Sequence, residues 1–249
     1  WQLPAGQSPM TPWAAKLRPV MLERPNQFRP GAPLDMASRA WAANFNEVKT
    51  VGSIDSPYRT AEQTDIARFW TANPIAQYNA AFGQITTERG LNAMQAARLF
   101  AMGNLVGTDA LIACFDAKYT YLFWRPQFAI PQGEYDGNAG TAGDPNWKPL
   151  LGAPTHPEYP SGHGCLTGAE AEVFAAFFGT NQIEIDLVST APNVVQTQRH
   201  YRHVHDLTRE VANARVWGGI HFRDATTAGL NTGRKVAHWT LKRFFLVEK

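Results

Sequence analysis

The feature that most constrains the fold is a long helical pattern from Leu91 to about Phe123, in which apolar residues occur almost all round the helix. Its apolar positions include Ala97, Leu99, Phe100, Leu105, Leu111, Ile112 and Phe115. A helix that is apolar on every side has to be surrounded by other elements, so it belongs in the middle of a bundle. Pro126 ends this helix or follows its end, because proline disfavours a helical conformation in the residue before it.

Further helical patterns lie on both sides of this central helix. Thr60 and Gln63 have the spacing of a capping box, which predicts a helix running from there to Trp70. Other helices are predicted over residues 35–48, 75–89, 161–178, 206–217 and 226–245. The pattern contains no alternation of strands with helices and no internal repeat. We therefore expect an all-α protein, a helical bundle.

Two segments do not follow the helical pattern. Residues 1–34 are rich in proline and predict an extended N-terminal arm that wraps the core. Residues 131–160 contain many Gly and Pro residues and predict a long loop, which in a compact domain is usually functional or mobile. The expected organisation is an arm over 1–34 and a helical-bundle catalytic domain over 35–249. Since the chain begins at Trp1 without a leader, we expect it to be part of a longer precursor or of a two-part protein.

Composition narrows the classes of function. The formal net charge is +2, from 23 basic and 21 acidic residues, so we expect neither a nucleic-acid partner nor a charged membrane surface. No run reaches the roughly 20 apolar residues that span a bilayer, so we expect no membrane insertion and a soluble protein, secreted or periplasmic. Cys114 and Cys165 lie in apolar stretches and are expected to be buried thiols, which leaves the redox compartment open.

The first segment that carries chemistry contains Lys118 and Arg125, with Pro126 directly after it. The two cations are seven residues apart, about 20° from eclipsed on a helix, and both can reach the same point. Two cations on one side of an apolar helix need a shared anion, because unpaired buried charge is costly. The alternative is a pair of surface residues whose stems lie along the helix.

The second segment is Pro160-Ser161-Gly162-His163, which precedes an apolar helical run. The free N–H groups at a helix N-terminus bind anions, and Gly162 allows an anion to approach the backbone. His163 would then lie beside the anion with a pKa suited to proton transfer near neutral pH. The alternative is an N-capping serine and a structural histidine.

The third segment joins Arg215 to His221 through Gly218 and Gly219. Arg215 is a bidentate anion donor of fixed charge. The two side chains lie about 120° apart on an ideal helix, and the glycine pair indicates that the helix ends there, which would let them converge. The alternative is a structural arginine and a core histidine.

Together these segments form the pattern Lys-x6-Arg-Pro, Pro-Ser-Gly-His and Arg-x5-His. The chain thereby resembles the superfamily of vanadium-dependent haloperoxidases and type 2 phosphatidic acid phosphatases. The finer resemblance, to bacterial vanadium haloperoxidase-like proteins, rests on Phe-Trp-Arg-Pro at 123–126, Pro-Glu-Tyr-Pro-Ser-Gly-His at 157–163 and Gly-Gly-Ile-His-Phe-Arg at 218–223. Family members usually have Ser where this chain has Ala214, and usually carry a further helical half upstream, with which this chain would associate.

The resemblance implies a role for each motif residue. His221 would be the single protein ligand to the metal of vanadate, or the nucleophile that forms a phosphohistidine in a phosphatase. Lys118, Arg125 and Arg215 would neutralise the oxyanion, assisted by the Ser161 hydroxyl and the Gly162 N–H. His163 would be the general acid–base, and Lys118 would also polarise bound peroxide. The cofactor would be vanadate, with phosphate competing for the same pocket.

His156 lies seven positions before His163, at a place that resembles the halide side of the haloperoxidases. The family has Phe there in chloroperoxidases and His in algal bromoperoxidases, so the resemblance favours bromide. The partners would then be hydrogen peroxide, a halide and a small organic substrate. The alternative is a loop histidine without a role. Nothing in the sequence indicates the oligomeric state.

Other polar residues lie near these motifs. His200, His203 and His205 could form a divalent-metal site, but the nearby arginines favour a polar loop at the rim of the pocket. Asp116 and Asp224 flank the basic residues, and either could orient a cation or His221.

Three functions fit these residues. A haloperoxidase is favoured by the finer motifs. A soluble acid phosphatase of the same superfamily is the first alternative, because the same pocket stabilises five-coordinate vanadate and the phosphoryl transition state. An inactive oxyanion-binding domain is the second, because of Ala214 and the missing upstream half.

Overall fold

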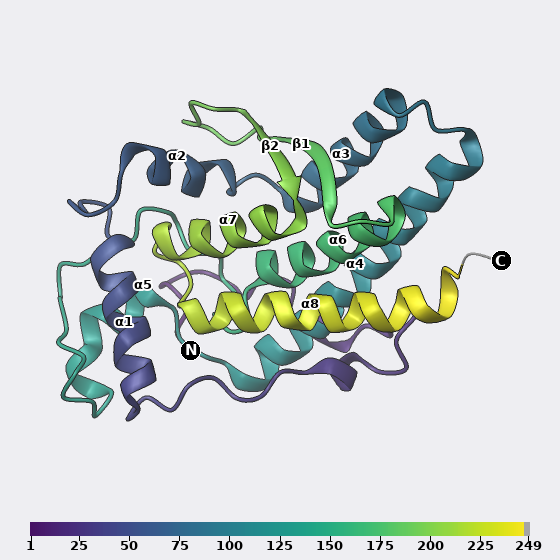
Figure 1. Ribbon diagram of the computed structural model, residues 1–249. Helices are drawn as coiled ribbons and strands as arrows, with labels where there is room; N and C mark the ends of the chain where they lie inside the picture. Colours follow the sequence, from purple (N-terminus) through teal and green to yellow (C-terminus); the bar gives the residue numbers. More distant parts are fainter. Residues whose placement is uncertain (247–249) are drawn as a thin grey trace.

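The structure is a computed structural model that describes residues 1–246. Its helical elements pack around α4, and one short hairpin lies on the outside (Figure 1). In chain order the elements are η1 Pro12–Lys16, η2 Pro25–Phe28, α1 Arg39–Val51, α2 Ala61–Phe69, α3 Pro74–Glu88, α4 Ala93–Tyr121, α5 Pro126–Ala129, η3 Ile130–Tyr135, α6 Gly162–Phe178, β1 Gln182–Val188, β2 Gln198–His203, α7 Val204–Trp217 and α8 Arg223–Phe244. The expectation of a mostly helical bundle is confirmed.

The helix boundaries follow local signals. Thr60 caps α2 through the predicted capping box with Gln63, and Asn92 forms a second capping box with Gln95 at the start of α4. The α7 helix ends at Trp217, just before the glycine pair, and Gly219 has a φ of 71°. This left-handed turn starts the chain toward His221 and α8, as predicted from the sequence.

The central helix α4 is 29 residues long and largely buried. The segment 93–135, which contains α4, is long and apolar enough to span a membrane by length and composition, with a mean hydropathy of 1.3 in its most apolar window. The sequence-based expectation that this run is too short was therefore wrong. Within that window 56% is buried inside the bundle, and the core helix of a soluble protein passes the same test.

The arm of residues 1–34 runs along α4 in an extended path with two short 3-10 turns (Figure 1). Asp109 of α4 is fully buried, and its carboxylate accepts the backbone N–H groups of Val20, Met21 and Leu22, each at 2.7 Å. Arg29 forms an ion pair with Asp116 at 2.7 Å. Asp116 therefore binds the arm, and the expectation that it orients one of the motif cations was wrong.

The hairpin of β1 and β2 was not predicted from the sequence. The two strands are antiparallel, with Ile185 opposite Tyr201 and Asp186 opposite His200. His200 is part of this hairpin, and its ring nitrogens lie 2.8 Å from Asp186 and 2.8 Å from Glu184. The expectation of a polar loop at the pocket rim was therefore wrong for His200, which bonds to two acids of the neighbouring strand.

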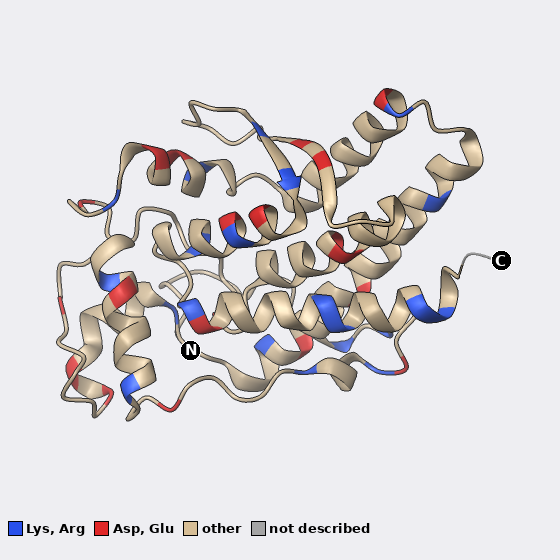
Figure 2. Ribbon diagram, viewed as in Figure 1, with Lys and Arg blue, Asp and Glu red and all other residues tan. Residues whose placement is uncertain are grey.

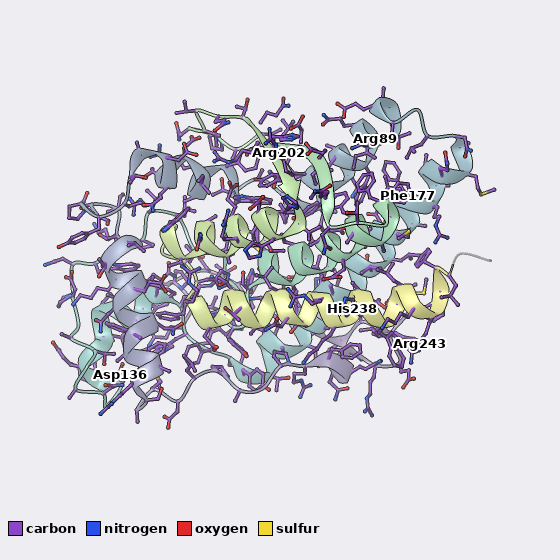
Figure 3. All side chains as sticks on the ribbon, viewed as in Figure 1. Arg89, Asp136, Phe177, Arg202, His238 and Arg243 are labelled. Carbon is purple, nitrogen blue, oxygen red and sulfur yellow. The ribbon has the colours of Figure 1, made fainter. Side chains whose placement is uncertain are left out.

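Small residues bring α6 and α8 into close contact (Figure 1). A Cβ on Gly233 of α8 would collide with the carbonyl oxygen of Cys165, and one on Gly168 of α6 would collide with the backbone of Leu230. At the surface of the same helix pair, His238, labelled in Figure 3, lies 2.9 Å from Glu172 of α6. Close packing of these two helices positions the N-terminus of α6, where the second motif lies.

Replacing Gly233 with alanine is expected to destabilise the protein by about 1–3 kcal/mol, because the added methyl group forces the two helix backbones apart. The measurement is the free energy of unfolding in urea. Gly83→Ala is the matched control: a Cβ there meets nothing within 4 Å, so alanine should stabilise α3 by roughly 0.5–1 kcal/mol. Equal free energies of unfolding for Gly233→Ala and the wild type would show that the contact is looser than described.

Charges of both signs are scattered over the outer faces of the helices in the view of Figure 2. The chain has 23 basic and 21 acidic residues, so no large excess of either sign is available to a surface. The unusual charges are the buried ones, and the buried cations Lys118, Arg125 and Arg215 belong to the three sequence motifs.

Candidate active site

Three cations of the sequence motifs are buried in one region. The exposed fractions of Lys118, Arg125 and Arg215 are 0%, 1% and 4%. They come from the last turn of α4, the residue before α5 and the last turn of α7. Burial is the main cause that lowers the pKa of Lys118 to about 8, of Arg125 to about 10 and of Arg215 to about 9, and repulsion from Arg125 lowers the pKa of the other two further.

The cations are held in place by backbone carbonyl groups. Lys118 Nζ donates to the carbonyl oxygens of Pro157 and Glu158, at 2.7 and 3.0 Å. Arg125 donates from Nε to His156 and from Nη1 to Ile220, at 2.9 and 2.8 Å. These bonds link the end of α4 both to the loop before α6 and to the segment before α8, so the three motifs meet although they are far apart in sequence.

Arg215 is the least satisfied of the three cations. Its Nη1 donates to the carbonyl oxygen of Trp70 at 2.5 Å, and its buried Nε has no hydrogen-bond partner within residues 1–246. The neighbouring Ala214, where the family usually has Ser, is fully buried and packs in the large apolar cluster. A buried guanidinium with an unused donor is an incomplete arrangement that an anion would complete.

His221 is oriented by a residue to which the sequence-based analysis assigned no role. Glu158 Oε1 lies 2.8 Å from His221 Nδ1 and also accepts the backbone N–H of Phe222 at 2.9 Å. Because Oε1 is already an acceptor, we infer that Nδ1 carries the proton and donates to it. The Nε2 atom then has a free lone pair, which is the form that binds a metal or attacks phosphorus.

Glu158 is the carboxyl group of this cluster, and it is itself fully buried. Burial raises the pKa of Glu158 to about 8, although Lys118 and Arg125 act in the opposite direction. The sequence-based expectation that Asp116 or Asp224 would orient His221 was wrong, because Glu158 does so. The signal that could have found it is an acidic residue inside an otherwise basic and neutral motif, Pro157-Glu-Tyr-Pro160.

The second motif forms the N-terminus of α6. Ser161 is the N-cap, and its hydroxyl oxygen accepts the N–H of Gly164 at 3.3 Å, which leaves the hydroxyl proton available for donation. Gly162 begins the helix, and a Cβ there would meet nothing within 4 Å. The N-terminus therefore has open space beside it, and the positive end of the helix dipole faces that space.

His163 is half-buried, and its Nε2 has no hydrogen-bond partner within the described part of the chain. Burial lowers the pKa of His163 well below its usual value, and repulsion from Arg215 and Lys118 lowers it further. The expectation of a pKa near neutral therefore does not hold in the absence of an anion. A bound oxyanion would offset the two cations and favour protonation of the ring.

His156 is buried beside the cations. Its Nδ1 lies 3.0 Å from Arg125 Nη2, and its ring centroid is 5.3 Å from that of Phe115. Burial and the repulsion of Lys118 and Arg125 lower the pKa of His156, so the ring is neutral. The structure therefore brings His156 to the same cluster as the other motif residues. Cys114 and Cys165 are buried, as expected.

The pH dependence of stability should report the burial of Glu158. Between pH about 4.5 and 8 the folded protein keeps a proton on Glu158 that the unfolded chain has lost. The contribution of Glu158 to the free energy of unfolding is therefore most favourable at low pH and falls as the pH rises to about 8. Glu158→Gln cannot ionise, so its Tm should gain on the wild-type Tm as the pH rises from 5 to 8. Glu88→Gln, at an exposed acid on α3, should run parallel to the wild type. Parallel curves for Glu158→Gln would contradict this account.

The comparisons with known proteins agree with this geometry. A family model described as the VCPO second helical-bundle domain matches residues 98–247, more than half of the chain. The vanadium chloroperoxidase of Curvularia inaequalis is 29% identical over 178 residues, which cover 53% of this chain and 28% of that protein.

Two solved structures extend the comparison to the fold. The first bacterial vanadium-dependent iodoperoxidase has a TM-score of 0.82 at 25% identity, and the match covers 100% of this chain and 61% of that one. The apo-type bacterial vanadium-dependent chloroperoxidase has a TM-score of 0.78 at 21% identity, over 95% of this chain and 56% of that one. The fold therefore defines a helical protein of the vanadium haloperoxidase class. The chain belongs to the family of the VCPO second helical-bundle domain, as its motifs predicted, and it spans little more than a quarter of the curated relative.

Proposed function

We propose that this chain binds vanadate and acts as a haloperoxidase, which oxidises a halide with hydrogen peroxide. The observation that supports it most is the buried cluster of Lys118, Arg125 and Arg215, in which Glu158 is the one fully buried carboxyl group within residues 1–246. Unneutralised buried charge is costly, and an oxyanion would offset it. The unused Arg215 Nε and His163 Nε2 fit the same occupant.

In this proposal the cluster divides into holding groups and one ligand. Lys118, Arg125 and Arg215 hold the oxygens of the anion, with the Gly162 N–H and the Ser161 hydroxyl. His221 would be the ligand through Nε2, because Glu158 occupies Nδ1. Vanadate, when bound, supplies the activation of peroxide toward the halide, while the protein supplies charge, orientation and protons.

His163 and His156 would serve the two sides of the anion. His163 lies at the start of α6, where its buried, unpartnered Nε2 can exchange a proton with a bound oxygen. His156 would lie on the halide side, and on that basis we propose bromide as the preferred halide. Chlorination at the rate of bromination would contradict the preference.

A phosphatase is the second candidate, because the same cluster suits any tetrahedral oxyanion. His221 Nε2, held by Glu158, is also suited to attack phosphorus and form a phosphohistidine. His163 would then donate a proton to the leaving oxygen. Both candidates use the same residues and differ in the bound anion.

The experiment is a paired assay on the purified chain, with and without added vanadate. Each aliquot is tested for peroxide-dependent oxidation of bromide, chloride and iodide, and for hydrolysis of an aryl phosphate. We expect bromination that requires vanadate and that phosphate inhibits. Hydrolysis inhibited by vanadate, without halide oxidation, would move the protein to the phosphatases. Vanadate binding without either activity would favour an oxyanion-binding domain that needs a further half.

A further inference from the structure

Glu170, in the middle of α6, is a buried carboxyl whose surroundings the proposed function does not explain. Its exposed fraction is 2%, and its Oε2 has no hydrogen-bond partner within residues 1–246. Among the other buried acids of that part of the chain, Asp65 and Asp109 accept backbone N–H groups on both oxygens, and Glu158 bonds to His221 and Phe222 through Oε1 while its Oε2 has no partner. Within residues 1–246, Glu170 is the acid of this set that accepts no hydrogen bond on either oxygen. An unsatisfied buried carboxyl costs stability and points to an occupant.

The carboxyl group lies at the floor of a pit between α3 and α4. The pit has a cavity volume of about 30 Å³ and opens to solvent. Its buried lining residues are Tyr78, Gly103, Gly107, Leu166 and Glu170. A Cβ on Gly107 would lie 2.7 Å from Glu170 Oε1, so the glycine makes the room that the carboxyl group occupies. Glycine in the middle of a 29-residue helix lowers the stability of that helix relative to alanine, so this space is kept open at a cost in stability.

The walls and rim decide what could enter. At the rim, the amides of Asn79 and Asn104 bond to each other at 3.1 and 2.9 Å. Leu111 and Leu166 form apolar walls, and the hydroxyl group of Tyr78 donates to Thr167 at 2.7 Å. Within residues 1–246, no Lys, Arg or His lines the pit. The pit thus combines one carboxyl group at its base with partly apolar walls, and a carboxylate there would have no counter-ion.

We propose that this pit binds a small primary alkylammonium ion. Its ammonium group would donate to the Glu170 carboxylate, and its alkyl stem would pack against Leu111 and Leu166. A hard metal ion needs about six oxygen ligands. The amides of Asn79 and Asn104 bond to each other and the Tyr78 hydroxyl bonds to Thr167, so the lining leaves few oxygens for such an ion. The proposal is independent of the function proposed for the cation cluster, since it uses none of the same residues.

The ionisation of Glu170 provides a direct readout. Burial raises the pKa of Glu170 well above its usual value, so the carboxyl group is protonated near neutral pH without a ligand. Binding of an ammonium ion would then displace that proton into the solution. The other titratable group that lines the pit is Tyr78 of α3, whose pKa burial also raises, and the pit-lining residues of α4 do not titrate.

The test uses ethylammonium chloride as the probe on the full chain at pH 8. Potassium chloride and tetramethylammonium chloride at equal ionic strength serve as controls. We expect a saturable rise in Tm with ethylammonium alone, with proton release detected by calorimetry in two buffers of different ionisation enthalpy. Glu170→Gln, which resembles the protonated acid in shape, should lose both the rise and the proton release.

A second variant keeps the test decisive if Glu170→Gln does not fold. Gly107→Ala fills the pit without changing its charge and should lose the ethylammonium effect, while Gly83→Ala on α3 should keep it. The same rise in wild type and Glu170→Gln, the same rise with potassium, or no saturable rise would each overturn the proposal. None of these outcomes depends on halide oxidation or phosphate hydrolysis, so failure here and failure of the proposed function are distinguishable.

Discussion

Replacing His221 with alanine is expected to lower vanadate-dependent bromide oxidation by at least about a thousandfold, a loss typical for removal of a group that acts directly on the reacting centre. The physical reason is the arrangement of its ring. Glu158 binds Nδ1 at 2.8 Å, so Nε2 is the atom left to act as the ligand. The measurements are the steady-state rate with saturating vanadate and, separately, vanadate binding by equilibrium dialysis.

The matched control for this variant is His200→Ala. His200 is exposed on the hairpin and bonds to Glu184 and Asp186, so its loss should change neither rate nor binding. If the purified chain is inactive, vanadate binding still tests the role of His221. Unchanged vanadate affinity and unchanged rate in His221→Ala would remove His221 from the site.

Replacing Arg215 with leucine is expected to weaken phosphate and vanadate binding by about 30- to 4,000-fold, since truncating one partner of a buried charge pair costs about 2–5 kcal/mol. The same change removes a buried charge that has one hydrogen bond and an unused Nε. The anion-free variant should therefore keep or exceed the wild-type Tm, while the rise in Tm caused by phosphate should disappear. If Arg215→Leu is at least as stable as the wild type without anion but binds the anion less tightly, the role of Arg215 is to bind the anion.

Arg209→Leu is the control for this second prediction. Arg209 lies on the same helix, α7, with 61% of its side chain exposed, and it pairs with Asp206 at the surface. Its replacement should leave anion affinity unchanged. If Arg215→Leu lost stability without anion yet bound phosphate with wild-type affinity, Arg215 would be a structural residue, the alternative that its sequence context left open.

Local sequence patterns predicted much of the fold and the residues proposed for the site. The apolar pattern around α4 predicted a central helix, the Thr60 capping box marked the start of α2, and the glycine pair marked the end of α7. Each of these signals depends on residues within about four positions of one another, where helix periodicity and capping act. The three short motifs also predicted which residues form the cation cluster.

Contacts between segments far apart in the sequence were not predicted. Glu158 and His221 are 63 residues apart, and no spacing rule pairs them. From the sequence, Asp116 and Asp224, which flank the motifs, were the acids expected to orient His221. The alternation of Ile183, Ile185 and Leu187 with polar residues in β1 is a strand signal that was missed. Its partner β2 is mostly polar and lies across a nine-residue connection, so it has no comparable signal of its own.

The sequence by itself determined a helical bundle and singled out the basic residues and histidines from which the proposed site is built. Only the tertiary structure decided the ionisation of those residues, the tautomer of His221 and the pit above Glu170. The physical reason is that burial and nearby charges set the pKa of a group. Both depend on how α4, α6 and α7 pack rather than on local sequence.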